Sequence, residues 1–465
     1  MPKRKRLFSS KVKLAPVNPD FQNYTVFQSK QEADLLLIQG RKPGFIPPPL
    51  NLSHLKGKTL FQANKPLAFL PNFDLRKEGK LSPIQDQGAA GTCWAFATYG
   101  SLESYLLPQQ EWNFSENNMK NLMSENCPEG YDRQPDGGGN QFISTAYLAR
   151  WNGPVLEAED PYDAFNASCS EYNPRKHIQQ AVYIPDRNGA LDNNNIKKAL
   201  VNYGAVFTSM FYDDASYNPD NYSYYYRGTS FSNHAICLVG WDDNYDRNKF
   251  INPPAGKGAY IGRNSWGSSW GDKGYFYISY YDSRIGSNNV LFNNAEDPNN
   301  YGVVHQYDPL GWVASAGYNS PSAWFGNVFT AENKETLAAV SWYVGSPNAD
   351  YQLMVYTNPQ NGNPRSGVRV KNLSGVIAEP GYYTKVFKKP YTLSKDLKFS
   401  VLVRLTTPGY NYPIPLEMAI PGYSSKASSS QGQSFISRNG RNWEEPADTW
   451  DNANVCIKAF ANIDE

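Results

Sequence analysis

The sequence predicts an α+β catalytic domain of two lobes, one helical and one β, followed by a β-sandwich domain. Apolar residues at helical spacing follow Cys93 and recur near Asn140–Trp151, whereas the later run Gly274–Tyr281 is β-prone. Beyond residue 300, short apolar strands alternate with Gly, Pro and Asn turns, which is typical of a β-sandwich. A chain of 465 residues is long enough for two or three such domains.

The composition argues against several kinds of partner. The net charge of +1 gives no electrostatic reason to expect nucleic acid or an acidic membrane surface. No run of about 20 apolar residues is present, so we expect no transmembrane helix. Aromatic residues make up 14% of the chain and charged residues only 19%, which favours an extracellular or cell-surface protein. The basic start, Met1–Arg6, is not followed by the apolar segment of a secretory signal.

Residues 1–70 differ from the rest, and we expect them to be a pro-region or N-terminal extension. A helix is expected from about Ser29 to Gln39, because Ser29 and Glu32 have capping-box spacing. The triple proline Pro47–Pro49 should be extended polyproline II. An extended segment from about Phe45 to Leu52 could block a catalytic cleft. The alternative is an extension packed on the surface.

One cysteine, Cys93, stands between a glycine-rich loop and an apolar helix. The apolar face of that helix contains Ala95, Tyr99, Leu102 and Leu106. Thr92 is a candidate N-cap. A helix N-terminus favours a thiolate, but a nucleophile also needs a base. Without a base, Cys93 would be an ordinary buried core cysteine.

The candidate base is one of only four histidines. His234 begins a short apolar run that ends at Trp241 and is typical of a buried strand. A second strand leads into Asn264, whose side chain could accept the imidazole N–H, and Trp266 could shield that bond from water. Together these residues supply a nucleophile, a base and an orienting group.

The blocks Gln87–Phe96, Asn233–Ala235 and Asn264–Gly267 resemble the papain-like (C1) cysteine peptidases, in the family's order. His234 follows Cys93 by 141 residues, within the family's range of about 130–150. Asn264 follows Cys93 by 171 residues, and an enlarged hairpin loop over 242–257 would account for the longer spacing.

The resemblance implies roles for four residues. Cys93 would be the nucleophile and His234 the general base and then acid. Asn264 would orient the imidazole, and the Gln87 amide with the Cys93 N–H would form the oxyanion hole. The resemblance also implies a resting thiolate–imidazolium pair, a thioester acyl-enzyme and a zymogen, with polypeptide substrates and neither cofactor nor metal.

The resemblance also identifies a cleft wall. Asp136–Asn140 is similar to the glycine-rich wall on which a substrate pairs as an added strand. Gly138 and Gly139 would let the peptide approach closely. The other expected substrate-binding residues are Gly91, Asn233 and Trp266. Asn140, Gln141 and Ser232 are expected to line the main specificity pocket.

Cysteine usage departs from the family pattern at one place. Ala90 stands where the family usually has a cysteine, so one common disulfide is missing. The resemblance implies a second disulfide, Cys127–Cys169. Cys237 and Cys456 are expected to be buried thiols.

The expected boundaries are a peptidase domain over 71–282, a polar, Asn-rich linker over 283–300, and a β domain over 301–465. The last resembles the lectin-like modules found C-terminal to some prokaryotic papain-like peptidases. Its expected strands are Leu337–Val344, Tyr351–Tyr356, Leu397–Leu405 and Val455–Ala461. Stacking on a carbohydrate or cell-surface ligand could involve Trp312, Trp324, Trp443 and Trp450; the alternative is that they are core or interdomain aromatics.

Two other functions compete with an endopeptidase. A transglutaminase-like acyltransferase also uses Cys and His, but its third member is normally Asp, which Asn264 does not match. The other is a binding or adhesion protein with an inactive peptidase domain. An inactive copy has no need of Cys93, His234, Asn264 and Gln87 together.

Overall fold

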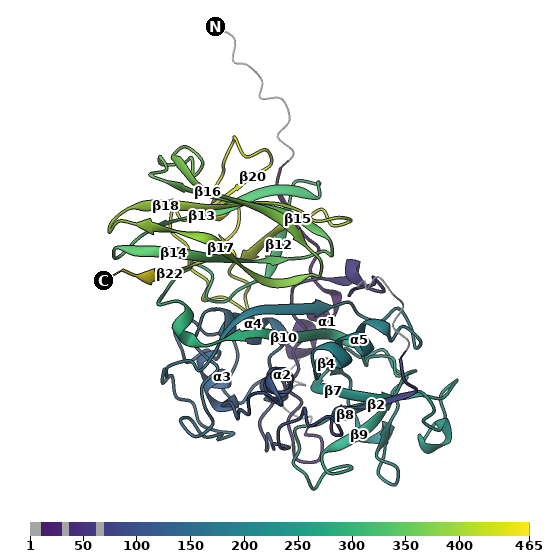
Figure 1. Cartoon of the computed structure of the whole chain (residues 1–465). Helices are drawn as coiled ribbons and strands as arrows, with labels where there is room; N and C mark the ends of the chain where they lie inside the picture. The colour runs from purple at the N-terminus through teal and green to yellow at the C-terminus, as the bar shows by residue number, and fades with distance from the viewer. Residues whose placement is uncertain (1–10, 30–36, 62–68, 465) are drawn as a thin grey trace.

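The computed structural model describes residues 11–29, 37–61 and 69–464. Figure 1 shows a half with the α-helices, coloured purple to teal, below a green-to-yellow half made mainly of β-strands. This arrangement confirms the predicted α+β class. Among the described residues, no helix has the length and apolar character needed to cross a membrane.

The first half is organised around α2 (Cys93–Leu106). Every residue of α2 except Tyr105 is buried, because the helix is enclosed on all sides. It packs against α3 (Glu116–Leu122) and α4 (Gln141–Ala149) on one side, and against strands of the β lobe on the other. The predicted apolar stripe is therefore only part of a fully buried helix.

The β lobe is built on an antiparallel ladder of four strands. Their order is β4 (Val206–Met210), β7 (His234–Asp242), β8 (Ala259–Arg263) and β9 (Tyr275–Ser279). The loop between β7 and β8 forms the long hairpin connection that the Cys-to-Asn spacing predicts. Smaller elements complete the lobe: α5 (Asn194–Asn202), β2 (Asn72–Asp74), β5 (Tyr217–Asn218) and β6 (Ser223–Tyr224).

The predicted linker over 283–300 is wrong. Residues Ser287–Glu296 form β10, which pairs with β3 (His177–Ile184) on one side and β4 on the other. Two of the asparagines that suggested a linker bond to β4: Asn289 Oδ1 accepts a 2.7 Å hydrogen bond from the Thr208 hydroxyl, and Asn288 Nδ2 donates to the Ser209 hydroxyl at 2.9 Å. The short apolar run Val290–Phe292 is buried and supplies the driving force.

The second half is the predicted sandwich. One sheet has the order β16 (Val368–Ile377), β15 (Ala349–Thr357), β18 (Lys398–Thr406), β13 (Ser322–Thr330) and β20 (Ser434–Ser437). The facing layer contains β11 (Val303–His305), β22 (Ile457–Ile463), β14 (Glu335–Val344) and β17 (Gly381–Leu393). A buried apolar core lies between the two layers.

The facing layer is continuous with the sheet of the first half. Residues Gly381–Tyr383 of β17 pair antiparallel with Gln180–Val182 of β3. A single sheet, 13-stranded within the described residues, therefore runs through both halves, and the boundary between them is crossed by main-chain pairing.

The N-terminal segment joins the two halves. Its strand β1 (Lys13–Leu14) adds to a small sheet of β12 (Ala314–Gly317), β19 (Ile414–Glu417) and β21 (Asn454–Val455). It then forms α1 (Pro19–Ser29), purple in Figure 1. The helix expected from Ser29 to Gln39 lies mostly outside the described residues. The signal for α1 was Pro19 at the first helical position, preceded by Asn18, whose Oδ1 accepts the Asp20 N–H at 3.1 Å.

Candidate active site

Cys93 is the first residue of α2 and is fully buried. Thr92 occupies the N-cap position, but its side chain makes no cap hydrogen bond. Its hydroxyl instead lies 2.7 Å from the Tyr162 hydroxyl, which donates to the carbonyl of Gln87 at 2.7 Å. The predicted N-cap position is confirmed, but the Thr92 hydroxyl contacts Tyr162, which links the glycine-rich loop to the helix, instead of capping the helix.

The structure brings His234 and Asn264 together beside that thiol. His234 begins β7, and its Nε2 lies 2.9 Å from Asn264 Oδ1. An Nε2–H donated to Asn264 leaves a lone pair on Nδ1, which is the tautomer a general base needs. The Trp266 ring centroid is 5.0 Å from the imidazole. The backbone N–H of Ala235, next to His234, donates to Cys93 Sγ at 3.3 Å.

Gln87 is fully buried and is oriented by the segment that carries Asn264. Its Oε1 accepts from the Ser265 hydroxyl at 2.7 Å and from Trp266 Nε1 at 3.2 Å. Its Nε2 donates to the carbonyl of Ala90 at 2.8 Å. Since an amide nitrogen carries two N–H groups, one donor remains for an oxyanion.

The N-terminal segment covers this site. The carbonyl of Gly44 accepts from the Gly139 N–H at 2.9 Å, and the Ile46 N–H donates to the carbonyl of Gly139 at 2.9 Å. On the opposite side, the Phe45 N–H donates to the carbonyl of Asn233 at 2.9 Å. An extended segment thus pairs with the predicted wall and with the residue before His234.

The close fit requires glycine on both sides of the contact. A Cβ on Gly44 would lie 2.1 Å from the carbonyl oxygen of Gly91. A Cβ on Gly138 would lie 2.7 Å from a side-chain carbon of Ile46, and one on Gly139 would lie 2.5 Å from the Trp94 ring. These positions explain why the wall and the segment are glycine-rich where they meet.

Cys93 and His234 lie buried beneath the segment, and burial shifts the pKa of each toward its neutral form. Burial raises the pKa of Cys93 to about 12, against the lowering effect of N–H donors such as that of Ala235. Burial also lowers the pKa of His234 to about 4, against the raising effect of the Asn264 hydrogen bond. In this covered state, burial therefore works against the thiolate–imidazolium pair that the resemblance implies.

Arg133 holds the cleft wall, and no sequence motif pointed to it. Its side chain is 5% exposed and donates to the carbonyls of Gly138 at 2.6 Å, Gly137 at 2.7 Å and Pro135 at 3.1 Å. It also donates to the carbonyl of Lys120 at 2.5 Å. Its guanidinium carbon lies 5.0 Å from the ring centroid of Trp94, the residue after Cys93.

The three expected pocket residues are divided between two places. Asn140 is the cap of α4: its Oδ1 accepts from the N–H of Phe142 at 3.0 Å and of Ile143 at 3.2 Å. Its Nδ2 donates to the carbonyl of Ile46 at 3.1 Å, so it also holds the covering segment. Gln141 and Ser232 line a cavity of about 520 Å³ that the segment 50–56 also lines.

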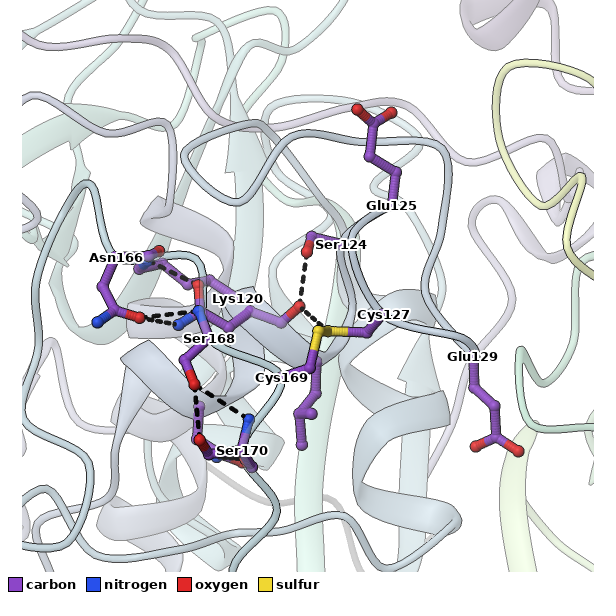
Figure 2. The surroundings of a disulfide bond; sticks show 12 residues. Lys120, Ser124, Glu125, Cys127, Glu129, Asn166, Ser168, Cys169 and Ser170 are labelled. Carbon is purple, nitrogen blue, oxygen red and sulfur yellow. Dashed lines mark hydrogen bonds between the residues drawn. A yellow bond between two sulfur atoms is a disulfide. The ribbon is translucent and has the colours of Figure 1, made fainter.

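The predicted Cys127–Cys169 disulfide is confirmed, with an S–S distance of 2.05 Å. Figure 2 shows it joining the loop after α3 to the loop that carries Asn166 and Ser168. Lys120 crosses beside it, with Nζ 2.6 Å from the carbonyl of Asn166. Cys237 and Cys456 are buried free thiols, as expected.

The tryptophans of the second half are mainly packing residues. Trp312 is 2% exposed and contacts Phe142 and Tyr183 of the first half, so the suggestion that it stacks on sugar is wrong. Arg365 covers the Trp324 ring at 4.6 Å. Trp443 and Trp450 are packed against apolar clusters. Within the described residues, no group of three or more His, Cys, Asp or Glu is placed to hold a metal ion.

A cysteine at a helix N-terminus facing a His–Asn pair across a two-lobed cleft defines a papain-like peptidase fold. Residues 70–292 match the model of the papain family cysteine proteases, and residues 304–461 match that of the lectin like domain. The chain therefore contains a papain family cysteine protease domain followed by a lectin-like domain.

Curated relatives match the first domain. A viral cathepsin of Adoxophyes honmai nucleopolyhedrovirus is 30% identical over 225 residues, which is 47% of this chain and 60% of that protein. A cathepsin L-like peptidase of Aedes aegypti is 27% identical over 213 residues, which is 43% of this chain and 56% of that protein. The chain thus spans less than two thirds of either relative.

Solved structures match both domains. The cysteine protease and lectin-like domains of Cwp84, a surface layer associated protein of Clostridium difficile, superpose with a TM-score of 0.81 and 23% identity. That match covers 98% of this chain and 100% of the other. Cwp84 after propeptide cleavage matches with a TM-score of 0.74 and 24% identity, over 84% of this chain and 99% of the other. At these identities the likeness establishes the shared fold.

Proposed function

We propose that this protein is a cysteine endopeptidase that hydrolyses polypeptides through a thioester on Cys93 and is made as a zymogen. The observation that carries the proposal is the 2.9 Å contact between His234 Nε2 and Asn264 Oδ1, with Cys93 Sγ held against the neighbouring Ala235 N–H. These groups face a wall that already binds an extended peptide main chain.

In the first half-reaction, His234 Nδ1 takes the thiol proton and Sγ attacks the scissile carbonyl carbon. The oxygen takes the electron pair and receives hydrogen bonds from Gln87 Nε2 and the Cys93 N–H. When the intermediate collapses, the C–N bond breaks and the amine leaves with the proton from His234. The acyl group remains on sulfur as a thioester.

Water completes the cycle. His234 takes a proton from a water molecule while the water oxygen attacks the thioester carbonyl carbon. Gln87 Nε2 and the Cys93 N–H stabilise the second oxyanion. Collapse breaks the C–S bond, releases the carboxylic acid and returns the proton to the thiolate. Asn264 keeps the imidazole in one orientation through both steps.

The covering segment explains the zymogen. Gly44–Ile46 occupies the wall, and its burial of Cys93 and His234 disfavours their charged forms. Removal of the segment would admit water and a substrate, and so restore the ion pair. Release of residues 1–70 is therefore the activating step.

We further propose an extracellular or cell-surface location and a carbohydrate or cell-surface ligand for the lectin-like domain. The Cys127–Cys169 disulfide supports export, because such bonds persist in oxidising compartments. Cell fractionation would test the location: recovery of the protein in the cytosol with both thiols reduced would contradict it.

An epoxide inhibitor of thiol proteases tests the peptidase directly. The processed protein should be labelled on Cys93, and Cys93→Ala should abolish the label; labelling that persists in the variant would contradict the proposal. Hydrolysis of a peptide that needs reductant and is lost in His234→Ala would separate an active enzyme from a binding protein with an inactive domain.

A further inference from the structure

We infer that processing uncovers a second peptide-binding site, on the lectin-like domain, which holds an extended part of the polypeptide substrate outside the catalytic cleft. This inference rests on the proposed peptidase function and zymogen. We call the site the β12 groove. It consists of the free edge that β12 would have without β1, together with Val313 and the segment Met418–Pro421.

The N-terminal segment shows how the β12 groove binds a peptide. Lys13 pairs with Gly317 and Leu14 pairs with Ala316 in antiparallel register. The Ala15 N–H then donates to the carbonyl of Ser315 at 2.8 Å. These contacts are made by main-chain groups, which every extended peptide has, so another chain can replace β1 without sharing its sequence.

Apolar contacts accompany the main-chain pairing. Leu14, Pro16, Val17 and Phe21 of the segment face a cavity of about 260 Å³. The lectin-like domain contributes Val313, Met418, Ala419, Ile420 and Pro421 to the same cavity. When the segment leaves, this apolar face and an unpaired strand edge become exposed together, which is the combination that binds an extended polypeptide.

The β12 groove is continuous with the catalytic cleft. Pro49 and Leu50 line the cavity, whereas Ile46, four residues earlier, pairs with the wall at Gly139. Four extended residues span at most about 14 Å. Hydrogen bonds join the stretch that pairs with β12 to the stretch that leads from the wall. The Asn18 N–H donates to the carbonyl of Pro49 at 3.0 Å, and Asn18 Nδ2 donates to the carbonyl of Pro48 at 2.9 Å.

This continuity identifies the substrate class. A chain bound at the cleft wall needs about four further residues to reach Pro49 and Leu50 and about four more to reach the edge of β12, so unfolded proteins and long flexible loops would occupy both sites. A peptide of three or four residues would occupy the cleft alone. A strand edge with apolar walls suits a peptide main chain with apolar side chains better than it suits a sugar.

Kinetics on long and short substrates test the inference. A recognition sequence for a sequence-specific protease would be inserted between Phe61 and Leu70. The full chain would be folded, cleaved there and separated from the N-terminal segment. In Met418→Glu, kcat/KM for an unfolded protein should fall about tenfold, while kcat/KM for a short peptide stays unchanged. The matched control is Val386→Glu on β17, a valine that is 57% exposed outside the groove and should change neither.

A binding measurement separates this inference from the peptidase proposal. In the cut protein carrying Cys93→Ala, a labelled peptide of residues 11–24 should bind, an unfolded protein should compete with it, and Met418→Glu should abolish binding. If this peptide binds as expected but the wild type hydrolyses no short peptide, the peptidase proposal fails and the groove stands.

Other outcomes overturn the groove itself. These are equal loss of kcat/KM on both substrates in Met418→Glu, no loss on either, binding that Met418→Glu leaves intact, or a segment that stays bound after cutting. A thermal melt of Met418→Glu matching that of the wild type would show that any loss is not due to unfolding.

Discussion

The Ile46 N–H donates a 2.9 Å hydrogen bond to the carbonyl of Gly139, so the chain's own N-terminal segment occupies the wall proposed to bind a substrate. The flanking Gly44 carbonyl accepts from the Gly139 N–H, which makes the contact a short parallel pairing. Because this pairing uses main-chain groups, the segment and a substrate compete for the same donors and acceptors.

Gly44→Val should activate the full chain without processing. Its Cβ would lie 2.1 Å from the backbone oxygen of Gly91, which forces the segment out of the cleft. We expect labelling of Cys93 by an epoxide inhibitor to become at least about tenfold faster. Gly302→Ala is the control, because a Cβ there meets nothing within 4 Å. Equal labelling rates for Gly44→Val and the wild type would contradict the prediction.

Gln87→Ala should lower kcat of the processed enzyme by about 10²–10³ with little change in KM, because the lost amide acts on the oxyanion. Steady-state kinetics on a short peptide measure this. Ser265→Ala removes only the hydroxyl that orients Gln87 Oε1 at 2.7 Å, so it should cost much less. A larger loss in Ser265→Ala than in Gln87→Ala would exclude the proposed oxyanion role.

Arg133→Met should loosen the cleft wall, since it removes the donor of three buried carbonyls and of the half-buried carbonyl of Gly138. We expect a loss of about 2–4 kcal/mol in the free energy of unfolding, measured with urea, and a raised KM for peptides. The rate at which a small thiol reagent modifies Cys93 should change far less than KM. Arg133→Lys should recover only part of the stability, because an ammonium cannot reach all four carbonyls.

Acid should weaken the docking of the N-terminal segment through His54. Its ring stacks on Tyr410 at 3.8 Å, and Nε2 lies 2.6 Å from the carbonyl of Gly345 in the lectin-like domain. Burial lowers the pKa of His54 from 6.5 to about 4. The released segment therefore binds the proton more tightly than the docked one, and docking stability is lost as the pH falls from 6.5 toward 4, by at most about 3 kcal/mol.

The measurement is the rate at which the full chain becomes labelled by the epoxide inhibitor between pH 7 and pH 4. Acceleration below pH 6.5 should be weaker in His54→Phe, which keeps a ring against Tyr410 but cannot take a proton. An identical pH profile for the two proteins would rule out a role for His54.

The parts of the site that were predicted are those with local sequence signals. Cys93 follows a glycine-rich loop, His234 begins an apolar run, and Asn264 precedes a Trp-Gly turn; each could be recognised from its neighbours. The structure places all three as expected, and their catalytic roles remain predictions. Gly138 and Gly139 were identified in the same way, and the main chain of the covering segment now lies against them.

The parts that were missed depend on contacts between distant residues. Arg133 carries no motif, and its function depends on carbonyls and a ring that only the fold brings around it. The strand Ser287–Glu296 looks polar in sequence, and the residues of β4 to which Asn288 and Asn289 bond, Ser209 and Thr208, come beside them only in the fold. Ala90 showed that one of the family's disulfides is missing, but it did not indicate that Tyr162 would hold the loop and Arg133 the wall instead.

The pairing of Gly381–Tyr383 with Gln180–Val182 has a mechanical consequence. A force applied to the lectin-like domain would act directly on interstrand hydrogen bonds near α4 and β10, because no flexible linker separates the two domains there. A protein truncated at residue 300 would likewise expose an unpaired strand edge on the peptidase domain, and such edges promote aggregation. The two domains are thus poor candidates for exchange with other modules, and anything that anchors one also restrains the other.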